Sequence, residues 1–219
     1  MEKDVNIKVV FPNMVTMMAL AFGVSSINMS LWGNWSLAVL FIVLAAFFDF
    51  MDGKVARLLG VSSKFGAELD SLSDFVSFGV APSLLMYQWT MNPGMRIQAM
   101  YNLAYKSQAI GVSWSIVLFL SMCCAARLAR FNTLLDEKQP SYWTHFFMGV
   151  PAPAGGAIAI LPLIMWLAFG KAPVFQNTYF VTCFMVFAGV MMASKIPTLS
   201  LKHMHIKRDY VSILAILGF

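Results

Sequence analysis

The chain has 219 residues, of which 59% are hydrophobic and 11% are charged, and its formal net charge is +5. A soluble domain would carry about a quarter charged residues, and the apolar residues here form long blocks without the polar faces that soluble helices present to water. This composition excludes an ordinary soluble enzyme and gives no reason to expect a nucleic-acid partner. It indicates an all-α integral membrane protein.

Several apolar blocks are about as long as a helix needs to be to cross a hydrocarbon core roughly 30 Å thick. Clusters of helix-breaking residues separate them, such as Gly33-Asn34 and Asn92-Pro93-Gly94. We therefore predict a six-transmembrane-helix bundle, forming one membrane domain over residues 1–219. The predicted spans are residues 13–29, 35–59, 67–90, 109–130, 153–170 and 178–194.

Another apolar run begins after Asp209 and reaches Phe219, the last residue of the sequence. A run this short cannot cross a bilayer as a helix. It is either an interfacial segment or the first part of a seventh span that the sequence truncates. We favour the truncated span, because Lys207, Arg208 and Asp209 resemble the charged flank of a membrane helix.

The basic residues predict the orientation in the membrane. If the N-terminus lies inside, twelve of the fifteen Lys and Arg residues fall on the cytoplasmic side, and only Arg96, Lys106 and Lys171 fall on the other. Such a bias is typical of cytoplasmic loops. We expect a multi-pass protein of the cytoplasmic (inner) membrane, with its N-terminus facing the cytoplasm.

Four aspartates lie near the predicted cytoplasmic ends of the second and third spans. Asp49 and Asp52 are three residues apart, and Asp70 and Asp74 are four apart, so each pair shares one helix face. Residues 60–66 form a short turn between the spans, which predicts two antiparallel neighbouring helices. The four carboxylates should then meet at a similar depth, on the cytoplasmic side where nucleotides are found.

Four such carboxylates would repel one another unless a cation lay between them. Oxygen ligands without His or Cys favour Mg²⁺ or Mn²⁺, and four carboxylates can hold two ions for a displacement at phosphorus. Gly53 and Gly66 leave room for a ligand, and Arg57 can contact a phosphate. The alternative is a salt-bridge network with Lys54, Arg57 and Lys64, but it leaves both glycines unexplained.

Residues 49–74 carry the pattern D-x-x-D-G-x-x-A-R-x8-G-x3-D-x3-D. This pattern resembles the signature of the CDP-alcohol phosphatidyltransferase family and matches it at every fixed position. The resemblance implies a metal-dependent membrane enzyme that acts on a CDP-linked lipid and commonly forms a homodimer. It also implies that Asp49, Asp52, Asp70 and Asp74 bind metal, that Asp74 is in addition the general base, and that Asp49, Gly53, Ala56, Arg57 and Gly66 line the CDP site.

Three further stretches, residues 65–82, 126–132 and 147–155, are most similar to the family branch that forms phosphatidylserine. That likeness implies transfer of the phosphatidyl group of CDP-diacylglycerol to L-serine, with release of CMP. We find no Ser, Cys or His in a nucleophile-and-base arrangement, so we expect direct displacement without a covalent enzyme intermediate.

The sequence offers several candidate residues for the acceptor site. Arg127 and Arg130, followed by Asn132, are candidates for binding the serine carboxylate, but both arginines serve equally well as cytoplasmic anchors. Ser77 is a weaker candidate, because it more simply bonds a carbonyl of its own helix. Glycerol phosphate, inositol phosphate or choline remain alternative acceptors.

The first predicted span and the class of function each allow a second interpretation. Asn13 and Thr16 either approach the nucleotide or, as we slightly favour for Asn13, cap the first helix. A cation transporter with an intramembrane acidic site is the rival from another class. It predicts polar residues that continue to the far side, whereas residues 36–48 are almost entirely apolar, which favours an enzyme.

Overall fold

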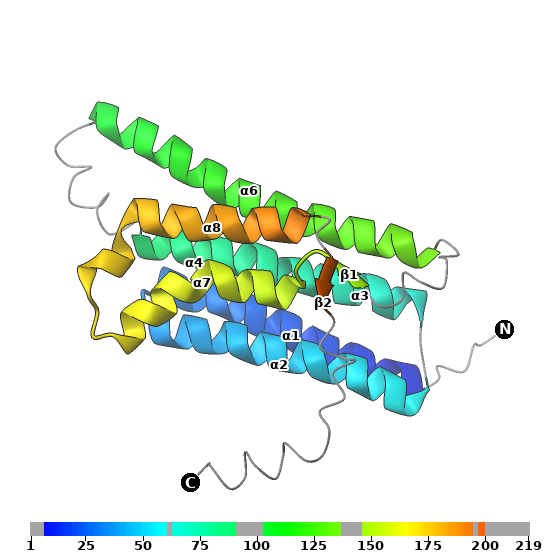
Figure 1. Cartoon of the computed structure of the whole chain (residues 1–219). Coiled ribbons are helices and arrows are strands. Elements are labelled where there is room, and N and C mark those ends of the chain that lie inside the picture. Colours follow the sequence, from blue (N-terminus) through cyan, green and yellow to red (C-terminus); the bar gives the residue numbers. More distant parts are fainter. Residues whose placement is uncertain (1–6, 61–62, 91–102, 137–145, 195–196, 200–219) are drawn as a thin grey trace, which may run out of the picture.

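The structure is a computed structural model of the chain, and it describes residues 7–60, 63–90, 103–136, 146–194 and 197–199. Helices follow the six predicted spans and pack side by side as a bundle (Figure 1). The prediction of an all-α membrane bundle is therefore confirmed in its main features. The helical elements are α1 (Ile7–Leu31), α2 (Trp35–Leu59), α3 (Lys64–Asp74), η1 (Phe75–Val80), α4 (Ala81–Thr90), α6 (Leu103–Asp136), α7 (Ala152–Ala168), η3 (Pro173–Gln176) and α8 (Thr178–Ala193).

Local sequence signals explain where the first helices begin and end. The Asn34 side chain accepts a hydrogen bond from the Leu37 N–H at 3.3 Å and so caps α2. At the other end, Gly60 adopts the left-handed conformation, with φ of 63°, and terminates α2. These two ends make α1, α2 and α3 alternate in direction, so that α1 and α3 run parallel.

The third predicted span is one helical column, but it is not a single α-helix. It passes from α3 through a π-helical segment, η1, into α4. In η1 the hydrogen bonds reach back five residues, as from the Ala81 N–H to the Val76 carbonyl. A π-helical turn holds about one residue more than an α-helical turn. The side chains of α4 therefore point in different directions from those they would have if α3 continued as an α-helix.

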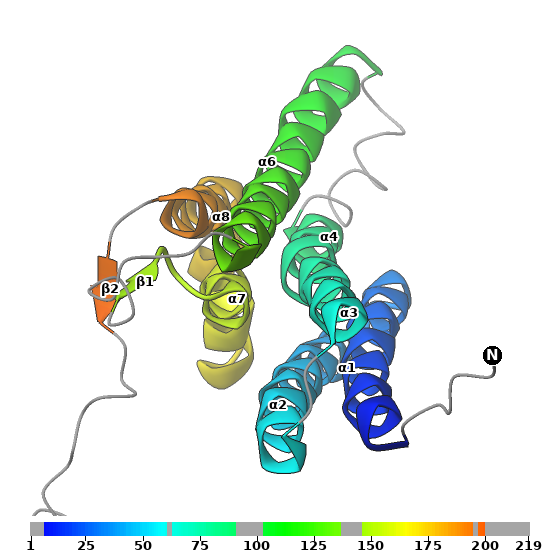
Figure 2. The ribbon, with the colours of Figure 1, turned by 90° about the vertical axis from the view of Figure 1, so that its right-hand side faces the viewer.

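The core of the bundle lies around η1 and α4. Phe78, Leu85, Met86 and Trp89 of this column are all less than 2% exposed. Seen end-on, the column lies between α1 and α2 on one side and α6, α7 and α8 on the other (Figure 2). The buried side chains of this column form one core cluster with residues of α2, α6, α7 and α8. The column continues directly into α3, so this core also fixes where α3 lies in the bundle.

Two short strands were not predicted from the sequence. β1 (Phe146–Met148) pairs antiparallel with β2 (Pro197–Leu199), with Phe146 opposite Leu199. Strands of three residues are too short to show an alternating pattern, so the sequence carries no signal for them. The pair lies at the edge of the bundle (Figures 1 and 2) and leaves the helical architecture unchanged.

Three described helical stretches are long and apolar enough to cross a membrane: Val10–Leu31, Trp35–Leu59 and Trp114–Thr133. α7 and α8 are shorter apolar helices. Large apolar side chains such as Val43, Phe47 and Phe50 point outward from α2, with more than half of their surface exposed. An apolar exterior is what contact with lipid requires, so the chain is a multi-pass membrane protein. The predicted seventh span lies outside the described residues.

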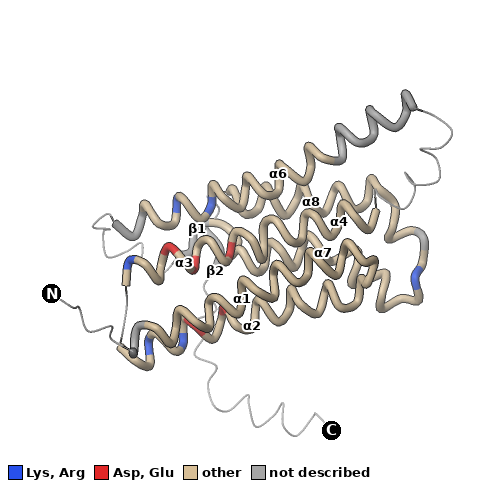
Figure 3. Tube along the Cα trace, turned by 180° about the vertical axis from the view of Figure 1, so that it is seen from behind, with Lys and Arg blue, Asp and Glu red and all other residues tan. Residues whose placement is uncertain are grey.

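Charge is distributed unevenly along the bundle. The described acidic residues gather at the end where α1 begins and α6 ends, together with most of the described basic residues (Figure 3). At the opposite end, Lys171 lies in the turn that follows α7. The candidate site therefore lies at the more basic end of the described bundle.

Candidate active site

Three of the four predicted aspartates meet between α2 and α3. Asp49, Asp70 and Asp74 each offer a carboxylate oxygen, and these three oxygens all lie within 4.8 Å of one another. The four-residue spacing of Asp70 and Asp74 places both on the α3 face directed at α2, as the sequence predicted. The arrangement has the dimensions and the oxygen donors of a site for a hard divalent cation.

Asp52 lies one turn further along α2 and is only 7% exposed. Its Oδ2 atom and the Oδ1 atom of Asp74 are buried and have no hydrogen-bond partner in the described part of the protein. A buried carboxylate oxygen without a partner is costly. These two atoms are therefore positioned to accept a ligand that the protein itself does not supply.

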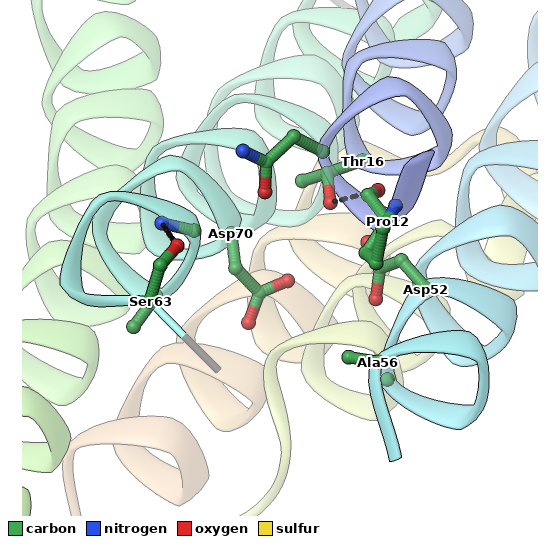
Figure 4. Close-up of a pocket in the computed structure, with 10 residues that line it drawn as sticks. Pro12, Thr16, Asp52, Ala56, Ser63 and Asp70 are labelled. Atoms are coloured by element: carbon green, nitrogen blue, oxygen red, sulfur yellow. Dashed lines mark hydrogen bonds between the residues drawn. The ribbon is translucent and has the colours of Figure 1, made fainter. Parts of the chain in front are cut away.

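A pocket of about 180 Å³ opens beside the aspartates, and Asp52 and Asp70 project into it from opposite sides (Figure 4). This volume is far larger than the water-sized voids of a packed interior. Three of the five residues expected at the CDP site line it, whereas Asp49 and Arg57 are not part of its wall. The lining residues are Pro12, Asn13, Thr16, Asp52, Gly53, Ala56, Ser63, Gly66, Ala67 and Asp70.

The amino end of α3 forms one side of this pocket. Ser63 caps the helix, because its Oγ atom accepts a hydrogen bond from the Gly66 N–H at 2.9 Å. The first turn of a helix carries partial positive charge and therefore suits an anion. Gly53 faces it from α2. Among the described residues and apart from its own helix backbone, the nearest atom to an added Cβ would be Arg57 Nη2, at 4.0 Å.

The first helix contributes more to the pocket than the sequence indicated. α1 already begins at Ile7, so Asn13 lies inside the helix, and the prediction that it caps the helix is wrong. Asn13 instead lines the pocket, as do Pro12 and Thr16 of the same helix (Figure 4). Pro12, Ser63 and Ala67 were not predicted, because only the folded arrangement brings them together.

The salt-bridge alternative is not supported by the basic residues of α2. The Lys54 ammonium lies 4.2 Å from the centroid of the Phe50 ring. Arg57 donates from Nε to the Gly53 carbonyl of its own helix at 2.8 Å. Both of these cations thus contact groups other than the aspartates.

The two arginines of α6 point to different partners. Arg127 lies close enough to Asp74 and Asp49 to interact with their charges, and its Nε atom is buried without a hydrogen-bond partner among the described residues. Arg130 donates from Nη1 to the Ala193 carbonyl at 3.0 Å and so satisfies the carboxyl end of α8. The structure brings only the first of the two to the aspartate cluster.

The other acceptor candidates bridge helices. Asn132 donates from Nδ2 to the Glu68 carboxylate at 3.2 Å and accepts from the Ser71 hydroxyl at 3.1 Å. Ser77 donates to the Ala19 carbonyl at 3.4 Å, which belongs to α1 and not, as expected, to its own helix. Asn132 thus joins α6 to α3, and Ser77 joins η1 to α1.

Comparison with known proteins gives the site its context. Residues 9–199 match the model of the CDP-alcohol phosphatidyltransferase family. The chain is similar to proteins named CDP-diacylglycerol–serine O-phosphatidyltransferase. The relative from Mycobacterium leprae is 36% identical over 93% of this chain, that from Helicobacter pylori 32% over 85%, and that from Bacillus subtilis 36% over 68%. The chain spans 61% of the length of the M. leprae protein and 70% and 73% of the other two.

Proposed function

The chain belongs to the CDP-alcohol phosphatidyltransferase family, and we propose that it transfers the phosphatidyl group of CDP-diacylglycerol to the hydroxyl of L-serine. The products are phosphatidylserine and CMP. The names of the similar proteins support serine as the acceptor. The observation that carries the proposal is the cluster of Asp49, Asp70 and Asp74 beside a pocket whose wall includes Asp52.

The carboxylates fit the divalent metal that this chemistry requires. Three of them are crowded within 4.8 Å, and the two unpartnered oxygens of Asp52 and Asp74 are buried. Hard oxygen donors favour Mg²⁺ or Mn²⁺, and we propose that Asp49, Asp52, Asp70 and Asp74 hold two such ions. When bound, these ions would neutralise the pyrophosphate and stabilise the CMP that leaves.

The pocket supports binding of the CDP group by residues of three helices. The amino end of α3 offers partial positive charge to a phosphate, and Gly53, Ala56 and Gly66 leave space along the wall. Arg57 stands one turn beyond Gly53 on the exposed side of α2 and would reach a phosphate after exchanging its carbonyl contact. The lipid chains would extend from this end of the bundle into the surrounding bilayer.

Asp74 is the residue we assign as general base. It is the last residue of α3. Its carboxyl group bonds Asp49, and its Oδ1 atom is buried without a hydrogen-bond partner among the described residues. It would accept the proton of the serine hydroxyl as that oxygen attacks the phosphorus that bears the lipid. The bond between this phosphorus and the bridging oxygen of the diphosphate then breaks, and CMP leaves. One displacement of this kind needs no covalent enzyme intermediate.

Arg127 is the residue we assign to the serine carboxylate. Its guanidinium lies beside the aspartates, where a bound serine would present its hydroxyl to Asp74. A phosphorylated acceptor would call for more positive charge, but Arg130 is engaged with Ala193 at the end of α8. Of these two arginines, only Arg127 lies beside the aspartates, which suits the single carboxylate of serine. Lys138, a third candidate for a phosphorylated acceptor, lies outside the described residues.

We also propose that the site faces the cytoplasm from the inner membrane and that the protein is a homodimer. The excess of basic residues at the site end supports the orientation, and the family resemblance implies the dimer. Labelling in sealed vesicles of a cysteine introduced at residue 33 or 61, in a variant in which Cys123, Cys124 and Cys183 are replaced, would test the orientation. Light scattering of the purified protein in detergent would test the dimer.

The activity is tested by adding CDP-diacylglycerol and one acceptor at a time to the purified protein in detergent. L-Serine, glycerol phosphate, inositol phosphate and choline form the panel, and CMP release and the lipid product are measured. Saturable release of CMP with L-serine is the expected result. Saturable activity with glycerol phosphate and none with serine would refute the assignment of the acceptor.

A further inference from the structure

Two buried serines join the aspartate-bearing column to the first helix. The Ser73 hydroxyl donates to the Thr16 carbonyl at 3.3 Å, and the Ser77 hydroxyl donates to the Ala19 carbonyl at 3.4 Å. Both serines are at most 2% exposed. Their four-residue spacing puts them on one face of the column, which lies against α1.

A close backbone approach continues this contact. A Cβ atom at Gly23 would collide with the Ser77 hydroxyl and lie 2.9 Å from the Ser77 Cα atom. α1 therefore packs directly on the backbone of η1 at this point. We call the two serine hydrogen bonds and this glycine contact the serine seam; it comprises Ser73, Ser77, Gly23 and the carbonyls of Thr16 and Ala19.

The seam connects the two parts of the candidate site. Ser73 immediately precedes Asp74, and Ser77 follows it within one turn. On the other side, Thr16 supplies both a seam carbonyl and a side chain in the pocket wall, opposite Asp70. A shift of α1 along the column would therefore change the position of the pocket wall relative to Asp74.

The π-helical segment directs its residues toward three different helices. Ser77 faces α1, whereas a Cβ at Gly156 of α7 would lie 3.1 Å from the Phe78 carbonyl oxygen. A Cβ at Gly79 would lie 3.0 Å from Cys124 Cβ on α6. The turn that follows Asp74 is thus held by close packing on several sides, and the seam supplies its hydrogen bonds.

We propose that the serine seam is a positioning element that fixes Asp74 relative to the pocket wall on α1. Ser73 and Ser77 act through Asp74 and do not touch substrate. Hydrogen bonds from small polar residues, combined with close backbone contact, are an effective way to fix one helix against another where both are surrounded by lipid. This inference rests on the proposed function, because the position of Asp74 matters only for its reaction.

The test compares Ser73→Ala and Ser77→Ala with a matched control. Ser26 is also a buried serine of the bundle, and its hydroxyl donates to the Ala38 carbonyl of α2 at 2.8 Å. Ser26 lies within one turn of Gly23, at the end of the seam away from the pocket. It is ten residues, or about 15 Å, along α1 from Thr16, which lines the pocket. Ser26→Ala removes the same kind of interhelical hydrogen bond at a distance from the site.

We expect each seam variant to lower kcat with serine about tenfold or more, because small displacements of a reacting group are costly. KM for CDP-diacylglycerol and for serine should change less than threefold. Ser26→Ala should lower the thermal stability about as much as the seam variants do, but its kcat should stay within twofold of that of the unaltered protein. Equal kcat in all three variants would overturn the proposal. A raised KM for serine in Ser77→Ala alone would assign Ser77 to the acceptor site instead.

A second measurement does not depend on turnover. The Mg²⁺ concentration at half of the maximal thermal stabilisation should rise at least threefold in the seam variants, because Asp74 belongs to the carboxylate cluster. It should stay unchanged in Ser26→Ala. If no acceptor releases CMP, the proposed function fails, but this measurement still tests whether the seam positions Asp74. The same half-maximal Mg²⁺ concentration in all variants would refute that role of the seam.

A reciprocal exchange across the seam completes the test. Gly23→Ala alone should lower kcat strongly, because the new methyl group collides with Ser77. Combining Gly23→Ala with Ser77→Gly removes the colliding hydroxyl and Cβ atom, but also the hydrogen bond to the Ala19 carbonyl. Activity should therefore rise from that of Gly23→Ala toward, but not above, that of Ser77→Ala. Failure of the second substitution to recover any activity would show that the approach of α1 to η1 does not set the position of Asp74.

Discussion

The backbone of Gly66 on α3 approaches Asn13 on α1 so closely that a Cβ atom at position 66 would lie 3.0 Å from Asn13 Oδ1. The same atom would lie 3.1 Å from the Ser63 hydroxyl, which caps α3. All three residues line the pocket. Gly66 therefore keeps the pocket wall and the amino end of α3 in contact.

Gly66→Ala should weaken binding of the CDP-lipid. Accommodating the methyl group must displace Asn13 or the Ser63 cap, and overpacking of this kind costs about 1–3 kcal/mol. We expect KM for CDP-diacylglycerol to rise about tenfold, with kcat less affected. Steady-state kinetics at saturating serine measures both constants.

The double variant Gly66→Ala with Asn13→Ala provides the control. It removes the oxygen that the new methyl group approaches most closely, so part of the lost affinity should return. If Gly66→Ala binds the lipid normally, the pocket wall accommodates the methyl group without loss of affinity, and the role assigned to the glycine is wrong.

Asp74→Asn should abolish turnover while largely sparing binding of CDP-diacylglycerol. The amide keeps the size of the carboxylate but cannot accept the proton of the serine hydroxyl, and general-base catalysis contributes about 10²–10⁴-fold. The loss should be larger still if the metal is also weakened. CMP release measures turnover, and isothermal titration with CDP-diacylglycerol in detergent measures binding.

Glu68→Gln is the matched control for this substitution. Glu68 is an acidic residue of the same helix, but its carboxylate accepts a hydrogen bond from Asn132 and an amide oxygen can do the same. Its activity should remain within twofold of the unaltered protein. Normal turnover in Asp74→Asn would remove Asp74 as the base.

Removal of divalent metal should abolish activity and lower thermal stability. Without a cation, the carboxyl groups of Asp49, Asp70 and Asp74 lie within 4.8 Å of one another in a partly buried site, where repulsion between like charges is only weakly screened. After treatment with EDTA, we expect Mg²⁺ or Mn²⁺ to restore both activity and the thermal midpoint. Calcium or sodium at the same ionic strength separates specific binding from screening.

Asp70→Asn should reduce the thermal stabilisation by Mg²⁺ or Mn²⁺ without changing the fold. One carboxylate fewer means less repulsion in the free protein and weaker binding of the ion, so the protein should gain less stability from Mg²⁺ than the unaltered protein does. A thermal midpoint that does not respond to Mg²⁺ or Mn²⁺ in the unaltered protein would contradict the assignment of the cluster as a metal site.

Much of the bundle could be predicted from the sequence, because its signals are local. Apolar length predicted the six spans, and the turns at Gly33 and Gly60 followed from residues that stop helices. The spacing of Asp70 and Asp74 placed both on one helix face, and the short turn before them predicted the meeting with Asp49. Each of these inferences needs only one helix or one pair of neighbours.

The rest of the fold and the site depends on contacts between segments far apart in the chain. Thr16 and Ser63 line the pocket only because α1 and α3 run parallel and in contact. The π-helical segment after Asp74 depends on packing against three helices, and none of residues 75–80 predicts it. Arg127 and Arg130 share a helix face in sequence, yet only the folded bundle shows that their side chains reach different partners.

The two arginines of α6 permit a test of the acceptor site in which each residue is the control for the other. Arg127→Ala should raise KM for serine about 10- to 100-fold, because a charge-assisted hydrogen bond contributes about 1.5–3 kcal/mol and about 1.4 kcal/mol corresponds to a factor of ten. KM for CDP-diacylglycerol should change little. Arg127→Lys, which keeps the charge but not the planar fork, should give an intermediate value.

Arg130→Ala should have the opposite pattern. Its guanidinium bonds the Ala193 carbonyl at the end of α8, so its loss should lower the thermal midpoint while KM for serine stays within twofold. The same two measurements on both variants therefore separate recognition of the acceptor from attachment of a helix end. The reverse result, a raised KM for serine in Arg130→Ala but not in Arg127→Ala, would contradict this assignment. The serine carboxylate would then have to bind on the side of α6 that faces α8, away from Asp74. Direct attack with Asp74 as the base would no longer fit the geometry.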